Sequence, residues 1–179
     1  MTTVRLRSEQ PADGAGIRRV LGDAFGRPDA ATPAEVRLVE ALRGSTAWLP
    51  ELSMVAEAAG EIVGYALLSR VTVEPSGTPA LALGPVAVRP DRQGLGYGTD
   101  VVEAVLDAAT ELGESLVVVL GSPAYYRRFG FQPAVRLGLT SPWSGLGSPW
   151  QALVLPTDTG DAPAPPPGEV SFPAPWSLV

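Results

Sequence analysis

A glycine-rich stretch at residues 93–99 has the residue types and spacing of a phosphate-binding turn. It lies between an apolar run that ends at Val88 and a helical pattern that begins near Asp100. Glycine permits unusual φ values, so backbone amides can approach a ligand, and the following helix adds the positive end of its dipole. The pattern predicts a phosphate or pyrophosphate site built from Gln93, Gly94, Leu95, Gly96, Tyr97, Gly98 and Thr99.

The spacing of these glycines excludes two common phosphate motifs. Gly94, Gly96 and Gly98 stand at alternate positions, so the dinucleotide pattern Gly-x-Gly-x-x-Gly is not met. The chain contains no lysine, which a nucleoside-triphosphate loop requires. What remains is Gln-x-x-Gly-x-Gly, beginning at Gln93, and its alternative interpretation is a strand-to-helix turn without a ligand.

Composition removes several other classes of chemistry. The chain has 179 residues, which suits one domain, and it contains no histidine and no cysteine. A Ser-His-Asp triad, a thiol nucleophile and a lysine Schiff base are therefore excluded. The net charge of -6 has the wrong sign for binding nucleic acid or an anionic membrane. No signal-like segment or bilayer-length apolar run is present, so we expect a cytoplasmic protein.

Apolar periodicities on both sides of the glycine turn predict an α/β chain. Residues 80–88 are apolar nearly throughout, as in a buried central strand, but Gly84-Pro85 should break the pairing with one neighbour and open the sheet. Residues 157–168 are rich in proline and alanine, and residues 169–179 are expected to dock as an edge strand. The other expected elements are a strand at 3–8, helices at 11–25 and 32–43 (the second with a capping box from Thr32 to Glu35), strands at 52–58 and 62–73 joined by a tight turn at 59–61, a helix at 100–112, a strand at 116–120, a short helix at 124–129, and strands at 134–139 and 150–155. The helix at 100–112 completes a β-α-β crossover, so the strands at 80–88 and 116–120 are expected to be parallel.

A second motif, Tyr-Tyr-Arg-Arg-Phe-Gly-Phe at residues 125–131, follows the strand at 116–120 after a proline turn. With the Gln-x-x-Gly-x-Gly stretch and the interrupted strand, it resembles the signatures of the GNAT superfamily of acyl-CoA N-acetyltransferases. The chain looks most like a bacterial branch of predicted N-acetyltransferases of unassigned substrate. The resemblance implies a mixed, splayed β-sheet flanked by helices, in the order β-α-α-β-β-β-α-β-α-β-β. It assigns residues 1–155 to the transferase domain and residues 156–179 to a Pro/Ala-rich C-terminal tail.

The resemblance also implies how the chain handles acetyl-CoA as a co-substrate. The pantetheine would pair with the backbone of Val86, Ala87 and Val88, and the pyrophosphate would lie on the amides of residues 93–99. Tyr126 matches the family tyrosine that protonates the departing thiolate, and a phenol is protonated at neutral pH. The acceptor would be a small-molecule or peptide primary amine. We leave a homodimer open.

Two departures from common family patterns are visible. Leu95 stands where the family often has a basic residue, which leaves Arg92 as the nearest substitute, and Ser122 stands where related sequences carry a histidine. Two other functional classes stay open at this point. One is a non-catalytic acyl-CoA binding or sensing module, and the other is a protein-interaction domain in which the proline-rich tail is the functional part.

The general base and the acceptor site are not fixed by the sequence. Glu35, Glu57 and Glu74 could each act as a base through water, and each is equally typical of a surface charge. Trp143 and Trp150 lie in or beside the loop that, by family analogy, borders the acceptor. They either line an apolar or cationic pocket or pack beneath a long loop.

Overall fold

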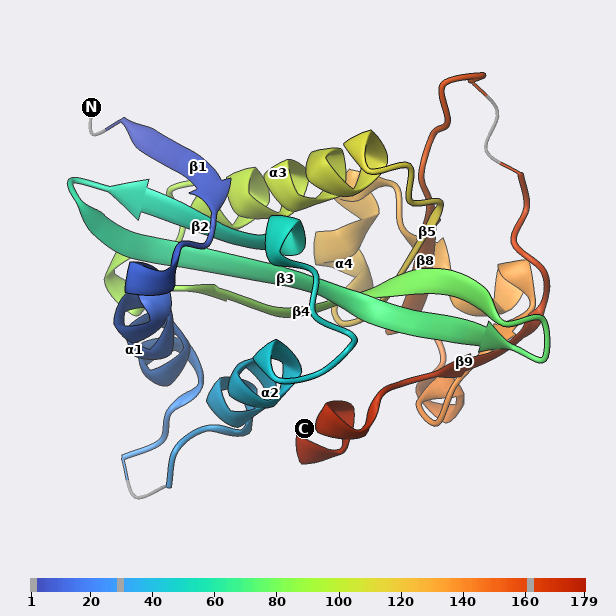
Figure 1. The fold of residues 1–179 in the computed structure, drawn as a ribbon, viewed down its shortest axis with the longest axis horizontal. Helices are drawn as coiled ribbons and strands as arrows, with labels where there is room; N and C mark the ends of the chain where they lie inside the picture. The colour runs from blue at the N-terminus through green and yellow to red at the C-terminus, as the bar shows by residue number, and fades with distance from the viewer. Residues whose placement is uncertain (1–2, 29–30, 161–162) are drawn as a thin grey trace. The chain divides into compact units, whose positions relative to one another are not determined.

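The chain forms two compact units in the computed structural model, which describes residues 3–28, 31–160 and 163–179 (Figure 1). The first unit comprises Met1–Leu68, Gly84–Ala108 and Ala174–Val179. The second comprises Ser69–Leu83 and Ala109–Pro173.

The first unit is built on antiparallel strands. β1 (Val4–Ser8) pairs with β2 (Ser53–Ala58), and β2 pairs with β3 (Glu61–Glu74) through a tight turn at residues 59–60. The register Ala58↔Glu61 places two residues in that turn, one fewer than the sequence predicted, because β3 already begins at Glu61. In the strand order β3 is followed by β4 (Thr78–Val88).

Two amphipathic helices supply the rest of the core of this unit. They are α1 (Gly14–Phe25) and α2 (Ala34–Arg43), and each ends at the residue expected from the sequence. The capping box expected at Thr32 is wrong, because the N-cap residue is Pro33, which carries no side-chain acceptor. The shared core consists of Ile17, Val20 and Leu21 from α1, Val36, Leu38, Val39 and Leu42 from α2, and Ala47, Val55, Tyr65, Leu67 and Ala87.

A series of hydrogen-bonded polar side chains reaches into this core from Glu9, the residue after β1. The Arg43 guanidinium pairs with Glu9 at 2.8 Å, and the Ser53 hydroxyl donates to the second Glu9 oxygen. The same hydroxyl shares a 2.8 Å hydrogen bond with the phenol of Tyr65, which is fully buried. Burial raises the pKa of Tyr65, so its phenol stays neutral.

The second unit contains the parallel step predicted for the centre of the sheet. β4 pairs in parallel with β5 (Leu116–Leu120) over Leu81↔Val117 to Leu83↔Val119. β5 pairs antiparallel with β8 (Trp150–Val154), which also pairs with β6 (Gln132–Pro133). The Arg70 guanidinium makes a bidentate pair with Glu114 at 2.6 and 2.7 Å.

The C-terminal part of the chain differs from two expectations. Residues 134–139 are not a strand: Ala134–Leu137 is a 3-10 helix, and only Leu139–Thr140 (β7) is extended. β9 (Gly168–Ser171) is not an edge strand, because it pairs with both β3 and β7. The proline- and alanine-rich stretch at 157–168 includes residues 161–162, which lie outside the described residues.

The element order agrees with the mixed, open sheet flanked by helices that the resemblance implied. α3 (Tyr97–Glu111) follows β4, and the short α4 (Pro123–Tyr126) follows β5. Among the described residues, no helix combines the length and apolar character needed to cross a membrane.

Candidate functional site

The break in β4 lies at Gly84-Pro85. The β4–β5 ladder ends at Leu83↔Val119, as the sequence predicted, so Val86 to Val88 have no β5 partner among the described residues. The Arg89 amide donates to Val63 of β3 at 2.9 Å. Because backbone groups of successive strand residues alternate in direction, Val86 and Val88 turn their N–H and C=O groups away from β3. Ala87 instead faces β3, and its side chain lies in the core.

The glycine turn joins this strand to α3. The Gln93 side-chain amide donates to the carbonyl of Val88 at 3.2 Å, which ties the turn to the end of β4. Gly94 (φ 76°) and Gly96 (φ 92°) have left-handed backbone, and an added Cβ at either would meet open space. These positions therefore require glycine for their backbone angles and present an uncovered backbone.

The helix after the turn begins three residues earlier than the sequence suggested. α3 starts at Tyr97, and the Asp100 amide already donates to the carbonyl of Gly96 at 3.0 Å. Gly98 and Thr99 consequently belong to the first helical turn. An α-helix offers unpaired N–H groups and a partial positive charge at that end, so the turn and α3 together form an anion-binding arrangement.

The charged residues before the turn bind their own acidic neighbours. Arg89 pairs with Glu61 at 2.8 Å and with Asp91 at 3.0 Å. Arg92 is partly exposed and lies 3.5 Å from Asp91, which makes it the more accessible guanidinium of the two. Leu95 is 60% exposed at the tip of the turn.

Tyr126 lies in the second unit, at the end of α4. Its ring packs edge-on against Tyr125 at 5.0 Å and against Phe131 at 5.6 Å, and a tilted contact joins it to Phe129. Burial, followed by the neighbouring Tyr125, raises the pKa of Tyr126 to about 12. The phenol is therefore protonated throughout the physiological range and can act as a proton donor.

Two residues that the sequence did not single out hold the Tyr126 ring in place. The backbone of Gly121 lies directly against the ring, and a Cβ there would overlap with Cε2 of Tyr126. The Gly121 amide donates to Pro149 at 3.0 Å, and its carbonyl accepts from the buried Gln151 side chain at 3.0 Å. Gln151 was detectable in the sequence as the one polar residue of an otherwise apolar strand, but its partner was not.

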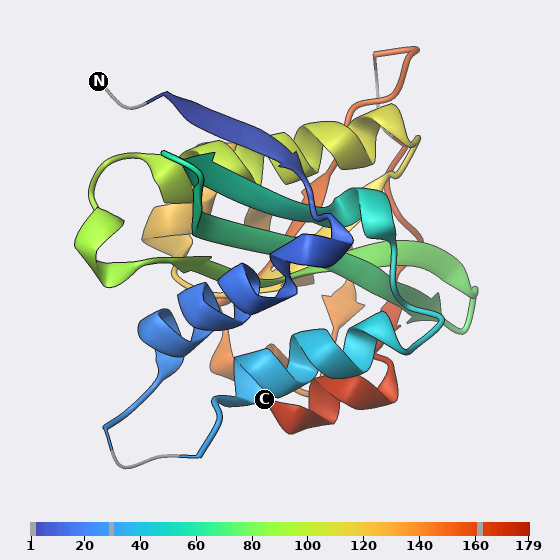
Figure 2. The same ribbon diagram turned by 60° about the vertical axis from the view of Figure 1, so that its left-hand side comes forward.

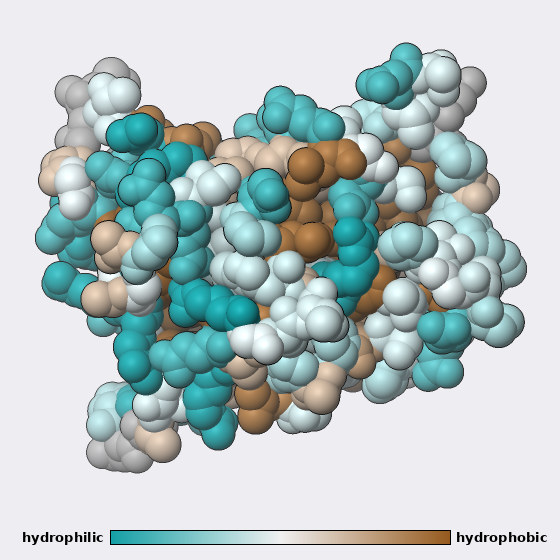
Figure 3. Space-filling model, viewed as in Figure 1, coloured by the Kyte–Doolittle hydropathy of each residue, from teal (hydrophilic) through white to brown (hydrophobic). Residues whose placement is uncertain are grey.

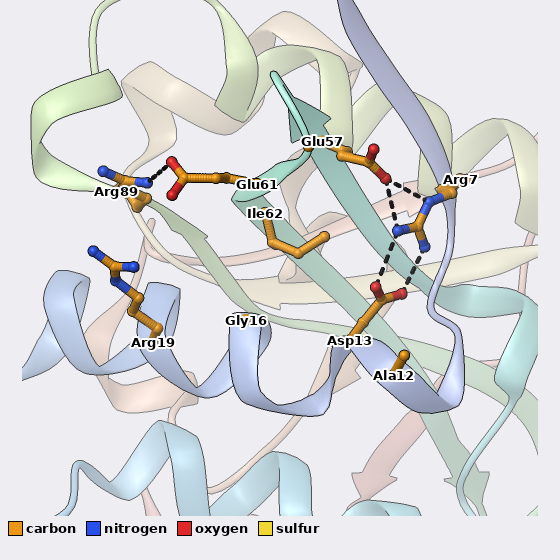
Figure 4. Close-up of a pocket in the computed structure, with 10 residues that line it drawn as sticks. Arg7, Ala12, Asp13, Gly16, Arg19, Glu57, Glu61, Ile62 and Arg89 are labelled. Carbon is orange, nitrogen blue, oxygen red and sulfur yellow. Dashed lines mark hydrogen bonds and ion pairs between the residues drawn. The ribbon is translucent and has the colours of Figure 1, made fainter.

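A surface depression in the first unit is lined by charged side chains, and most of these form ion pairs with one another. In Figure 4 the Arg7 guanidinium points toward Asp13 and Glu57, with N–O distances of 2.6 and 2.8 Å. Hydrogen bonds from Arg7 hold the pKa of Asp13 below its ordinary value. Figure 3 shows that the surface over β1 and α1 is largely hydrophilic. These pairs tie β1 to α1 and β2, and they engage Glu57, one of the three candidate bases.

The two tryptophans considered for the acceptor site pack with the C-terminal segment. Trp150 is 1% exposed and donates its indole N–H to the carbonyl of Leu139 at 3.1 Å. Trp143 packs edge-on against Phe172 at 4.7 Å. Trp150 is therefore a core residue, and packing is the interpretation that fits it.

Known proteins resemble this chain in sequence. The sequence pattern of the acetyltransferase (GNAT) family matches residues 19–131. The uncharacterised N-acetyltransferase YhbS of Escherichia coli (strain K12) is 33% identical over 140 residues, which cover 78% of this chain and 80% of that protein. The uncharacterised N-acetyltransferase YjhQ of the same strain is 34% identical over 124 residues, or 68% of this chain and 66% of that protein.

Two solved structures with bound coenzyme share the fold. The crystal structure of YhbS from Escherichia coli in complex with CoA has a TM-score of 0.85 at 30% identity, covering 99% of this chain and 93% of that one. A GNAT family acetyltransferase from Brucella melitensis in complex with acetyl-CoA has a TM-score of 0.77 at 31% identity, covering 97% and 98%.

Proposed function

The chain belongs to the acetyltransferase (GNAT) family, and we propose that it transfers an acetyl group from acetyl-CoA directly to a primary amine. The observation that carries this proposal is the continuous path from the open side of β4 to the turn at residues 93–96 and the start of α3. A strand that loses its neighbour at Leu83, followed directly by an anion-binding turn, suits a ligand with an extended amide arm and a pyrophosphate.

The residues of the first unit fit the co-substrate part by part. Val86 and Val88 offer backbone groups on the unpaired side of β4 for the amides of the pantetheine. The Val88 carbonyl is already used by Gln93, so Val86 carries more of this pairing. The uncovered backbone at Gly94 and Gly96, with the first turn of α3, would hold the pyrophosphate. Arg92 supplies the nearby positive charge that Leu95 lacks.

Tyr126 supplies the proton for the leaving group. The amine nitrogen attacks the thioester carbonyl carbon, a C–N bond forms, and the C–S bond breaks. The sulfur leaves as a thiolate and takes the phenolic proton of Tyr126. The attacking nitrogen gives up its extra proton to water, and the Tyr126 phenolate regains a proton from water, so the products are a neutral amide and the CoA thiol. The amine must arrive deprotonated for this attack, so we expect activity to rise with pH until Tyr126 ionises.

The test is a turnover assay on the full chain with a panel of primary amines. Because the protein has no cysteine, a thiol reagent reports only the CoA that the reaction releases. We expect Tyr126→Phe to lower turnover by well over ~10-fold with little change in acetyl-CoA affinity measured by calorimetry. Tyr125→Phe is the matched control, since it removes a hydroxyl from the adjacent ring.

The outcomes separate the assigned role from the assigned activity. Equal turnover in Tyr126→Phe and the unchanged protein would refute the role of the phenol. Acetyl-CoA binding without turnover of any amine in the panel would instead favour an acyl-CoA binding or sensing module.

A further inference from the structure

The C-terminal end of the chain folds back into the first unit. Residues Ala174–Leu178 form a 3-10 helix, η7, which packs on α2 (Figure 2). The indole of Trp176 is half-buried against the core that α1, α2 and the strands share. This packing is consistent with the burial of Leu38, which lies beside the stripe of α2 formed by Val36, Val39 and Leu42.

Trp176 contacts the break in β4 itself. Gly84 has a φ of 152°, and a Cβ added there would lie 3.2 Å from Cη2 and 3.8 Å from Cζ3 of the indole. The absence of a side chain at Gly84 lets the indole edge approach the strand backbone. The aromatic ring is therefore a direct neighbour of the residue at which the β4–β5 ladder has stopped.

We propose that Trp176 forms one wall of the acceptor side and selects amines carried on an apolar or aromatic group. This inference rests on the proposed function and adds to it that the thioester carbonyl, at the end of a pantetheine paired with Val86, lies at the break in β4. A nucleophile that reaches a carbonyl held at Gly84 passes the indole of Trp176. A partly exposed indole favours flat apolar groups and gives a small polar amine little to contact.

The segment that carries Trp176 is held firmly enough to act as a fixed wall. Within η7 the Ser177 hydroxyl donates to Ala174 at 2.8 Å. η7 also packs on α2, and the Trp176 indole packs on the core of the same unit. Such support preorganises a binding wall before the ligand arrives.

The test compares two amines, benzylamine and ethanolamine, in the thiol-release assay with saturating acetyl-CoA. We expect Trp176→Ala to raise the KM for benzylamine about tenfold. The KM for ethanolamine and the Kd of acetyl-CoA should change by less than about twofold, since a small polar amine gains little from the indole and the pyrophosphate is assigned to the turn at residues 93–96. Trp176→Phe keeps an aromatic ring and should restore most of the preference for benzylamine.

Trp48→Ala is the matched control, because Trp48 is another half-buried tryptophan packed on the same core. It should lower stability without changing the ratio of the two KM values. An unchanged KM ratio in both Trp176 variants, with normal turnover, would overturn the role of Trp176 and leave the proposed function intact. Should Trp176→Ala fail to fold, Trp176→Phe and Trp176→Leu provide the same comparison. Absence of turnover of every amine by the unchanged protein would refute the proposed function, and this inference with it.

Discussion

Gly121→Ala tests whether the proton donor is positioned by close packing against the backbone. The added methyl would overlap with Cε2 of the Tyr126 ring and lie 3.0 Å from its Cδ2 atom. Gly121 cannot retreat easily, because Pro149 and Gln151 hold its amide and carbonyl at 3.0 Å each. The ring must therefore move, against its edge contacts with Tyr125 and Phe131.

The geometry gives the size of the expected effect. Restoring an ordinary contact requires the ring to shift by about 1 Å, and such a displacement of a catalytic group costs roughly 100-fold in turnover. That loss corresponds to about 2.7 kcal/mol in the activation free energy. The overpacking itself should lower the free energy of unfolding by about 1–3 kcal/mol, which a domain of ordinary stability tolerates.

The assay measures kcat by thiol release, the Kd of acetyl-CoA by calorimetry, and unfolding in urea. We expect kcat to fall while the Kd stays within about twofold, since the turn at residues 93–96 is untouched. Gly22→Ala is the control: it lies in α1 with open space around its Cβ position, and it should raise the free energy of unfolding by about 0.5–1 kcal/mol without changing kcat.

Two results would count against this reasoning. One is an unchanged kcat for Gly121→Ala when Tyr126→Phe is strongly impaired, which would mean that ring position is not limiting. The other is a further large loss when Gly121→Ala is added to Tyr126→Phe, since the clash should matter only through the phenol.

Three other predictions concern the turn, the core and the proton donor. Gly96→Ala forces a side chain onto a φ of 92°, which costs about 1–2 kcal/mol of backbone strain, and we expect acetyl-CoA binding measured by calorimetry to weaken about 5–30-fold. Gly77→Ala is the control, because its φ of 70° imposes similar strain away from the turn, and it should leave the acetyl-CoA affinity unchanged. Tyr65→Phe removes the buried hydrogen bond to Ser53 and should lower the free energy of unfolding by about 1–2 kcal/mol in urea; a change below about 0.3 kcal/mol would contradict this. With the pKa of Tyr126 raised to about 12, the phenol stays protonated above the ordinary value of about 10, so kcat should hold to about pH 11; loss of half the activity near pH 10 would show an unshifted tyrosine.

Local patterns in the sequence were enough for much of the fold. Alternation and helical spacing predicted the β2–β3 hairpin, α1, α2 and the parallel pairing of β4 with β5. They failed at residues 134–137, where an apolar patch forms a 3-10 helix with Val135 57% exposed. Short patches carry too few residues for periodicity to separate a strand from a tight helix.

The glycine turn was also readable from the sequence, because its chemistry is local. A strand end, two left-handed glycines and a helix start follow one another within a few residues, and Gln93 bonds back to Val88 only five positions away. Tyr126 was identified by its motif. Its role as a donor stays a prediction, as do the assignments of residues 86–88 and 93–99 to acetyl-CoA.

What only the tertiary structure decided are contacts between residues far apart in the chain. Gly121 meets Gln151 across two strands, and Trp176 meets Gly84 after the chain has returned through β9. Periodicity records which face of an element is apolar, but it does not record which distant segment covers that face. Trp176 looked in the sequence like the end of an appended tail, and packing made it a neighbour of the break in β4.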